Sequence, residues 1–348
     1  MTFAPDFWTS HMGSVPNPAS DGVAGRLAAL LDVPAWPQLP RRTFRENMYV
    51  QYSAGLPGLV LDEANEKVYF DTSGDLAPAL EAFYERVLAD DVDSFGLDAD
   101  TAEGFFATLD ALRAMPGEWA KGQVTGPVSF GLTVTDHNLR ASLYDERLAD
   151  PIVTQLAMNA RWQVRQLRAV RSQTIIFVDE PYMASFGSAF ISLGREDVIA
   201  MLDIVFDAIH QEGALAGVHC CANTDWAVLL ATSVDILNLD AYGYLDNLAL
   251  YPAELRAFLD RGGVVAWGIV PNTEAIFSTT PDDIARRLWD GFALISQKAA
   301  ARGVAIAVEE LAARAMIMPS CGLGPATVAV AERVFEVLPA TARLLREG

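Results

Sequence analysis

Two cysteines and a histidine are adjacent in the segment GVHCCANTD, in a chain with only three cysteines and four histidines among its 348 residues. Side chains alternate along a strand, so we expect His219 and Cys221 on one side and Cys220 on the other. Imidazole and thiolate groups are zinc ligands, and zinc binds roughly four such groups in a tetrahedron. Cys321, in the segment PSCGLG, offers a third ligand. The pattern therefore predicts a zinc site that joins two distant parts of the chain.

Asp240, at the end of the next apolar run, offers a carboxylate oxygen as a fourth ligand. A second interpretation needs no metal. Buried cysteines often behave as small hydrophobic side chains, and His219 would then be a hydrogen-bonded residue at a strand end. Spacing alone leaves both interpretations open, because the chain lacks the paired Cys-x-x-Cys signature of many zinc sites.

Short apolar runs that end in glycine, proline or polar residues carry these groups, and we interpret them as strands. Helical patterns separate the strands. The clearest helix is expected from 281 to 302, with Thr280 as N-cap, Pro281 at the first position and Asp283 completing a capping box. Another is expected from Pro325 to residue 338. The expected strands cover residues 122–130, 174–181, 214–221, 234–243, 263–272 and 313–322.

Strands that are apolar on both faces and alternate with helices are typical of a parallel sheet covered by helices. This succession favours an α/β fold of the eight-stranded TIM barrel type, (β/α)8, over an open sheet. We expect one domain over residues 1–348, in which residues 1–115 contribute the early strands and an irregular extension. Active sites of such barrels lie at the rim where the strands end. The polar residues at predicted strand ends are Asp179, Glu180, His219, Cys221, Asp240, Asn272 and Cys321.

Charge and composition exclude several classes of partner. The formal net charge is -20 and the sequence pI about 4.5, so the molecule repels nucleic acid and anionic membrane surfaces. No apolar run approaches the roughly 18 residues of a membrane helix. The first residues lack the basic start and apolar stretch of a signal peptide. We therefore expect a cytoplasmic protein that binds neither nucleic acid nor membranes.

Several short motifs, taken in order, resemble the catalytic C-terminal half of cobalamin-independent methionine synthase. They are MGSVPN, TGPVSF, FVDEP, HCC, LNLDA and PSCGLG, spread over residues 12–324. That family belongs to the barrel superfamily of uroporphyrinogen decarboxylase and the methylcorrinoid:coenzyme M methyltransferases. The resemblance implies a short core form of the synthase, with zinc bound by His219, Cys221 and Cys321. Asp240 stands where the family has a glutamate, and its side chain is one methylene shorter.

The resemblance also implies an amino acid substrate, L-homocysteine. It assigns Asp179, in FVDEP, to the substrate ammonium and Ser14, in MGSVPN, to the substrate carboxylate. Judged from the residues alone, Asp179 and Glu180 could equally form a solvated acidic pair at a strand end.

Glu46 is a second candidate for the ammonium group. The other interpretation of Glu46 is a structural ion pair with Arg42 or Arg45. His137 and His210 receive no role, because neither belongs to a motif that indicates chemistry.

Two departures from the family concern the methyl donor. The full-length synthase has an additional N-terminal half that helps to hold methylfolate, and this chain has no room for it. The family also protonates the departing folate nitrogen with a histidine on the strand that aligns with residues 263–272, which contain no histidine. A methylcorrinoid needs no such acid, because cob(I)alamin is a stable leaving group. We therefore expect methylcobalamin or a related corrinoid as donor, carried by a partner protein, since the chain lacks an Asp-x-His-x-x-Gly cobalamin motif.

Three other functions stay open. A methylcorrinoid:coenzyme M or other thiol methyltransferase would use the same zinc but would place basic residues around a sulfonate. A uroporphyrinogen decarboxylase-like protein would need arginines for its carboxylates and no metal. A zinc-buffering protein would close the metal to substrate thiols. Metal-dependent hydrolases on this fold usually need more histidines than the four present.

Overall fold

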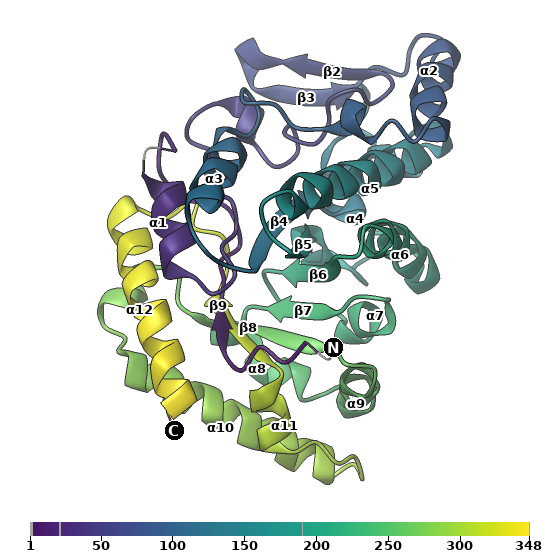
Figure 1. Cartoon of the computed structure of the whole chain (residues 1–348). Helices are drawn as coiled ribbons and strands as arrows, with labels where there is room; N and C mark the ends of the chain where they lie inside the picture. The colour runs from purple at the N-terminus through teal and green to yellow at the C-terminus, as the bar shows by residue number, and fades with distance from the viewer. Residues whose placement is uncertain (1–2, 21, 190, 348) are drawn as a thin grey trace.

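The computed structural model describes residues 3–20, 22–189 and 191–347. A curled sheet of seven parallel strands forms its centre, in the order β1-β9-β8-β7-β6-β5-β4 (Figure 1). From β4 onwards, each strand therefore pairs with the strand that follows it in the sequence. The strands of this sheet are β1 (Trp8–Thr9), β4 (Trp119–Thr125), β5 (Gln173–Asp179), β6 (Leu215–Cys220), β7 (Ile236–Leu239), β8 (Val264–Val270) and β9 (Ala315–Pro319).

Each of the six apolar runs contains a strand, as predicted, but every strand ends before its run does, and in two runs a helix begins within the predicted range. In the first run β4 ends at Thr125, and Pro127 opens helix α4 (Pro127–Thr133). In the fourth run β7 ends at Leu239, and Asp240 caps helix α8 (Ala241–Leu248). Proline at the first helical turn and aspartate at the N-cap both favour a helix start, which explains the shorter strands.

The sequence predicted a closed eight-stranded barrel, and this prediction is wrong. The sheet has seven strands and stays open, with β1 and β4 at its two edges. An irregular segment, residues 33–38, lies between these edges. Val33 N donates to Thr9 O (3.0 Å), and Lys121 N on β4 donates to Pro34 O (2.9 Å). The segment VPAWPQ contains two prolines, which have no N–H to donate, so it cannot form a regular ladder on both sides.

Helices cover the outer face of the sheet (Figure 1). The capping box predicted for the clearest helix is confirmed, because the Asp283 N–H donates to Thr280 Oγ1 (3.2 Å) at the start of α10. The last helix begins at Val328, not at Pro325, and ends at Glu347. Besides α4 and α8, the α-helices are α1 (Val23–Leu30), α2 (Ala77–Leu88), α3 (Glu103–Ala114), α5 (Glu146–Arg168), α6 (Arg195–Gln211), α7 (Trp226–Ala231), α9 (Pro252–Asp260), α10 (Pro281–Ala300), α11 (Val308–Ala313) and α12 (Val328–Glu347).

The first 115 residues contribute one strand, β1, to the curled sheet, where several early strands were expected, and an irregular extension. The extension includes an antiparallel hairpin, β2 (Leu59–Asp62) and β3 (Lys67–Phe70), which lies at the same end of the molecule as α2 (Figure 1). Buried side chains from Phe7 to Leu345 form the main core between sheet and helices. In the part of the chain that is described, no helix has the length and apolar character needed to cross a membrane.

Candidate metal centre

His219, Cys221 and Cys321 lie together at the end of the sheet where the strands finish. His219 is on β6, Cys221 follows that strand, and Cys321 is in the loop after β9. His219 Nε2 lies 2.9 Å from Cys221 Sγ and 3.8 Å from Cys321 Sγ, and the two sulfurs are 2.8 Å apart. One nitrogen and two sulfurs this close together form a donor set of the kind that zinc prefers, and could hold one ion.

Cys220 points away from this group, as strand alternation predicts. Its side chain is buried in the main core, and its thiol donates to Ala222 O (3.5 Å). Burial raises the pKa of the Cys220 thiol to about 12. Cys220 is therefore a neutral core residue.

The two remaining thiols, those of Cys221 and Cys321, are coupled through the contact between their sulfurs. The hydrogen bond from Cys221 and the nearby His219 lower the pKa of Cys321 to about 4. The same hydrogen bond, together with burial, raises the pKa of Cys221. Cys321 is therefore the more readily deprotonated of the two thiols.

Asn238 contacts His219 from the neighbouring strand, and sequence analysis missed it. The two residues are directly opposite each other in the β6–β7 register, and Asn238 Oδ1 lies 2.5 Å from His219 Nδ1. The available signal was one polar residue inside the apolar run that forms β7, but its meaning depends on how β7 pairs with β6.

The structure does not bring Asp240 into the donor group. Its Oδ1 accepts a hydrogen bond from Gly243 N (2.8 Å) as the N-cap of α8. Burial, together with the nearby Cys321, raises the pKa of the Asp240 carboxyl. The group of donor atoms that lie within 4.8 Å of one another consists of His219, Cys221 and Cys321.

A cavity of about 260 Å³ adjoins the three donors. The described residues that line it include no lysine or arginine. Its charged lining residues are the carboxylates Glu46 and Asp179. The predicted site residues in its wall are Ser14, Glu46, Asp179, His219, Cys221 and Cys321.

Asp179 lines this cavity and has one carboxylate oxygen without a hydrogen-bond partner among the described residues. That oxygen, Oδ1, is buried. Burial raises the pKa of Asp179 to about 6, an effect that His219 and Lys121 oppose. A buried acceptor without a partner is costly, which makes Asp179 a candidate partner for a hydrogen-bond donor.

Glu180 differs from its neighbour, and the interpretation as a solvated acidic pair is wrong for it. Its side chain is fully buried and accepts hydrogen bonds from Val128 N (2.9 Å) and Ser129 N (2.7 Å). Burial raises the pKa of Glu180 to about 7. Glu180 therefore holds the start of α4 against β5 and does not face the cavity.

Lys121 is a buried cation inside the sheet that sequence analysis missed. Its side chain is 0 % exposed, and Nζ donates to Met12 O (3.2 Å) and lies 4.4 Å from the centre of the Phe177 ring. Burial lowers the pKa of Lys121 to about 8, and the negative charge of Asp179 opposes that shift. A lysine near the start of a strand gives no sign in the sequence that it points inward.

Glu46 lines the cavity, but its carboxylate is already paired. Arg42 Nε donates to Glu46 Oε1 (2.5 Å), and Leu39 N donates to Oε2 (2.7 Å). Arg45 instead pairs with Glu63 (2.6 Å). Glu46 therefore forms the structural ion pair with Arg42 that was the alternative prediction.

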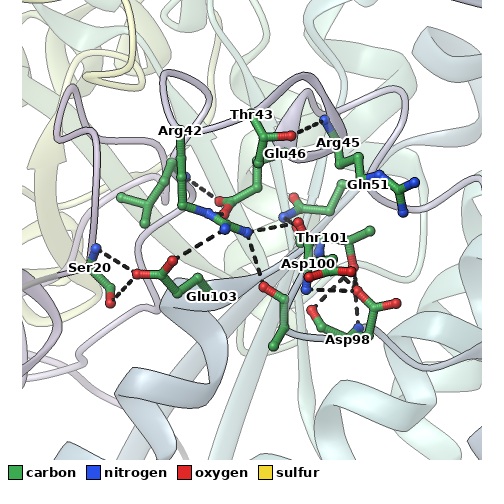
Figure 2. Close-up of polar contacts among 12 residues, drawn as sticks. Ser20, Arg42, Thr43, Arg45, Glu46, Gln51, Asp98, Asp100, Thr101 and Glu103 are labelled. Atoms are coloured by element: carbon green, nitrogen blue, oxygen red, sulfur yellow. Dashed lines mark hydrogen bonds and ion pairs between the residues drawn. The ribbon is translucent and has the colours of Figure 1, made fainter. Parts of the chain in front are cut away.

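Arg42 ties Glu46 to the start of α3 and to the loop before it. It also forms an ion pair with Glu103 (3.3 Å) and donates to Asp100 O (2.7 Å), and Glu103 in turn accepts from Ser20 (Figure 2). Burial raises the pKa of Glu46, and Arg42 opposes this shift. The network fixes one wall of the cavity.

Ser14 joins the loop from the start of the chain to the loop that carries Cys321. Its Oγ accepts from Gly324 N (3.2 Å), and Leu323 N donates to Ser14 O (2.9 Å). A Cβ at Gly322 would lie 2.3 Å from Ser14 Oγ, so the loops pack this closely only because residue 322 is glycine.

Comparison with known proteins assigns the chain to no family. No protein-family model matches the chain, and no curated protein matches it.

Proposed function

We propose that this chain is a zinc-dependent methyltransferase that transfers a methyl group from a methylcorrinoid to the thiol of L-homocysteine, which yields methionine. The observation that carries the proposal is the convergence of His219, Cys221 and Cys321 beside a cavity with an unpaired buried carboxylate, Asp179. The motif resemblance to methionine synthase supports the same reaction. We also propose a TIM-type barrel in which residues 33–38 take the place of a strand.

The donor set explains why a substrate thiol would react. Cys221 and Cys321 contribute two negative charges as thiolates, and His219 contributes none as a neutral imidazole. When bound, a zinc ion would hold the substrate sulfur as a thiolate and leave it nucleophilic. In the transfer the carbon–cobalt bond breaks, its electron pair stays on the corrinoid as cob(I)alamin, and a sulfur–methyl bond forms.

The cavity wall would orient the amino acid end of homocysteine. Asp179 Oδ1 would accept from the ammonium, and Ser14 Oγ would donate to the carboxylate. Asp240, which caps α8, is not needed as a ligand in this proposal. Three protein ligands leave a position for the substrate sulfur, as in other catalytic zinc sites.

The acidic wall also weighs against a coenzyme M-type acceptor. A sulfonate would need an arginine or lysine partner, and the described cavity residues include neither. Asp179 and the thiolates would instead repel such an anion.

The test uses zinc-loaded protein, methylcobalamin and three thiols: homocysteine, coenzyme M and mercaptoethanol. Under anaerobic conditions, mass spectrometry measures the methylated thiol and absorbance measures cob(I)alamin. We expect homocysteine to be methylated fastest, and no reaction with Cys321→Ser. Equal methylation of coenzyme M would contradict the proposed acceptor, and no methylation of any thiol would contradict the reaction.

A further inference from the structure

We propose that Asn238 is a positioning residue for the metal centre, because its amide holds His219 in the tautomer that leaves Nε2 free to bind a metal. The inference rests on the proposed function only for the identity of that metal. The contacts that carry it lead from Ala266 on β8 through Asn238 on β7 to His219 on β6.

Asn238 lies in the interior of the curled sheet, although its strand is otherwise apolar. It is fully buried, and Ile236, which shares its face of β7, belongs to the small apolar cluster inside the sheet. A buried amide is costly unless its polar atoms are hydrogen bonded. Both polar groups of Asn238 have partners, and one of those partners is His219.

The neighbouring strand determines which way the amide faces. Asn238 Nδ2 lies 2.6 Å from Ala266 O on β8, and 3.5 Å from Met318 Sδ on β9. A backbone carbonyl can only accept a hydrogen bond, so the amide NH₂ must be on this side. The amide oxygen must therefore face His219.

The amide oxygen in turn determines the imidazole tautomer. Oδ1 can only accept, so His219 Nδ1, at 2.5 Å, must carry a proton. A neutral imidazole with a proton on Nδ1 has its lone pair on Nε2. That nitrogen faces Cys221 Sγ and Cys321 Sγ, the other two donors. Partners of this kind, behind a metal ligand, commonly affect metal affinity by about 10- to 100-fold.

The first test reads the tautomer in the unaltered protein. With protein labelled with ¹⁵N-histidine, long-range ¹H–¹⁵N spectra distinguish protonated and metal-bound nitrogens, and the chain has only four histidines to assign. In the zinc-loaded protein we expect the His219 proton on Nδ1 and the metal on Nε2. A metal on Nδ1 would overturn the proposal. If no zinc binds, the proposed function fails. The spectrum of the metal-free protein then tests the role of Asn238 alone: a neutral imidazole with its proton on Nδ1 supports that role, and one with its proton on Nε2 overturns it.

The second test compares variants by chelator competition for zinc. Asn238→Leu keeps the volume but removes the acceptor, and we expect zinc affinity to fall about 10- to 100-fold, with rapid exchange of the Nδ1 proton. Asn238→Asp keeps an acceptor oxygen and should recover most of the affinity. The control Met318→Leu removes a contact on the other side of the amide and should bind zinc as the parent does. Parental zinc affinity in Asn238→Leu would overturn the proposal, whatever the methylation assay gives.

Discussion

Alternation along β6 divides the cysteines of the HCC segment by environment. Cys220 is buried in the main core, whereas Cys221 lies beside Cys321 and His219 at the cavity. Two adjacent residues of the same type therefore have different tasks. Substitution of each one separately tests this division.

We expect the purified protein to hold about one zinc ion per chain, as catalytic sites of this type do. Cys221→Ser and Cys321→Ser should each lose the metal, because a hydroxyl is a poor replacement for a thiolate. Cys220→Ser should keep it. Elemental analysis after dialysis measures the metal content. An equal loss in all three variants would refute the division of roles.

Asp179→Asn should weaken the binding of homocysteine and leave the zinc content unchanged. The lost charge-assisted contact with the ammonium should cost roughly 1.5 to 3 kcal/mol of binding free energy. A thiol without an amino group, such as mercaptoethanol, should bind both proteins equally. Calorimetry with the two thiols separates these cases, and equal effects on both would rule out an ammonium contact.

At the residue scale, the polar positions at the ends of the apolar runs included three residues that do meet at the cavity: His219, Cys221 and Cys321. Asn238 and Lys121 were not predicted, because the contacts that distinguish them are made to residues outside their own strands. A single polar residue in an apolar run gains its meaning only from the register with the next strand, which the sequence does not display.

At the element scale, local signals predicted helices and strands well. The capping box at Thr280 predicted the start of α10, and apolar runs predicted six strands of the sheet. Closure of the sheet was not predicted correctly. The prolines of residues 33–38 were visible in the sequence, but the position of that segment between β1 and β4 depends on long-range contacts.

The end of α6 is tied to the sheet by a pH-sensitive contact. His210 Nε2 lies 2.8 Å from Asp235 Oδ2, which also accepts from Ala216 N at the start of β6 (2.8 Å). The hydrogen bond to Asp235 raises the pKa of His210 above its ordinary value of 6.5. Protonated His210 therefore stabilises the fold. This contribution is complete below pH 6.5 and disappears as the pH rises through the higher pKa of the folded state.

His210→Gln should reduce the free energy of unfolding by at most about 1 kcal/mol below the unfolded pKa of histidine, because solvent screens a pair that is about a third exposed, and by less at about pH 9. Urea unfolding at both pH values measures the difference. His137→Gln, which changes a histidine outside this contact, serves as the control. A loss of stability in His210→Gln that is the same at both pH values would show that protonation of His210 does not contribute.

At the scale of the whole molecule, segments far apart in the sequence meet at the candidate site. Ser14 contacts the loop that carries Cys321, more than 300 residues later in the sequence, and β1 pairs with β9. The donor set therefore depends on the pairing of β6, β7, β8 and β9, which brings the loop after β9 to the end of β6. The site belongs to the complete sheet and not to a local motif.

The residues on β8 and directly after it bear on the choice between a folate and a corrinoid as methyl donor. A folate nitrogen must be protonated as it leaves, and β8 has no histidine. Asn272, which follows it, donates to Gly322 O (3.2 Å) and accepts from Ser320 Oγ (2.9 Å), and a neutral amide is no acid. Cob(I)alamin needs no proton to leave.

We therefore expect methyl transfer to homocysteine from methylcobalamin and none from methyltetrahydrofolate. Anaerobic assays compare the two donors at equal protein and zinc, with Cys321→Ser as the inactive control. Transfer from free methylcobalamin should be slow and should accelerate with a methylated corrinoid protein, because a docked partner orients the methyl group towards the sulfur. Turnover with methyltetrahydrofolate alone would mean that another group supplies the proton. In that case the donor assignment would fail, while the metal ligands His219, Cys221 and Cys321 would remain to be judged by the zinc content of their variants.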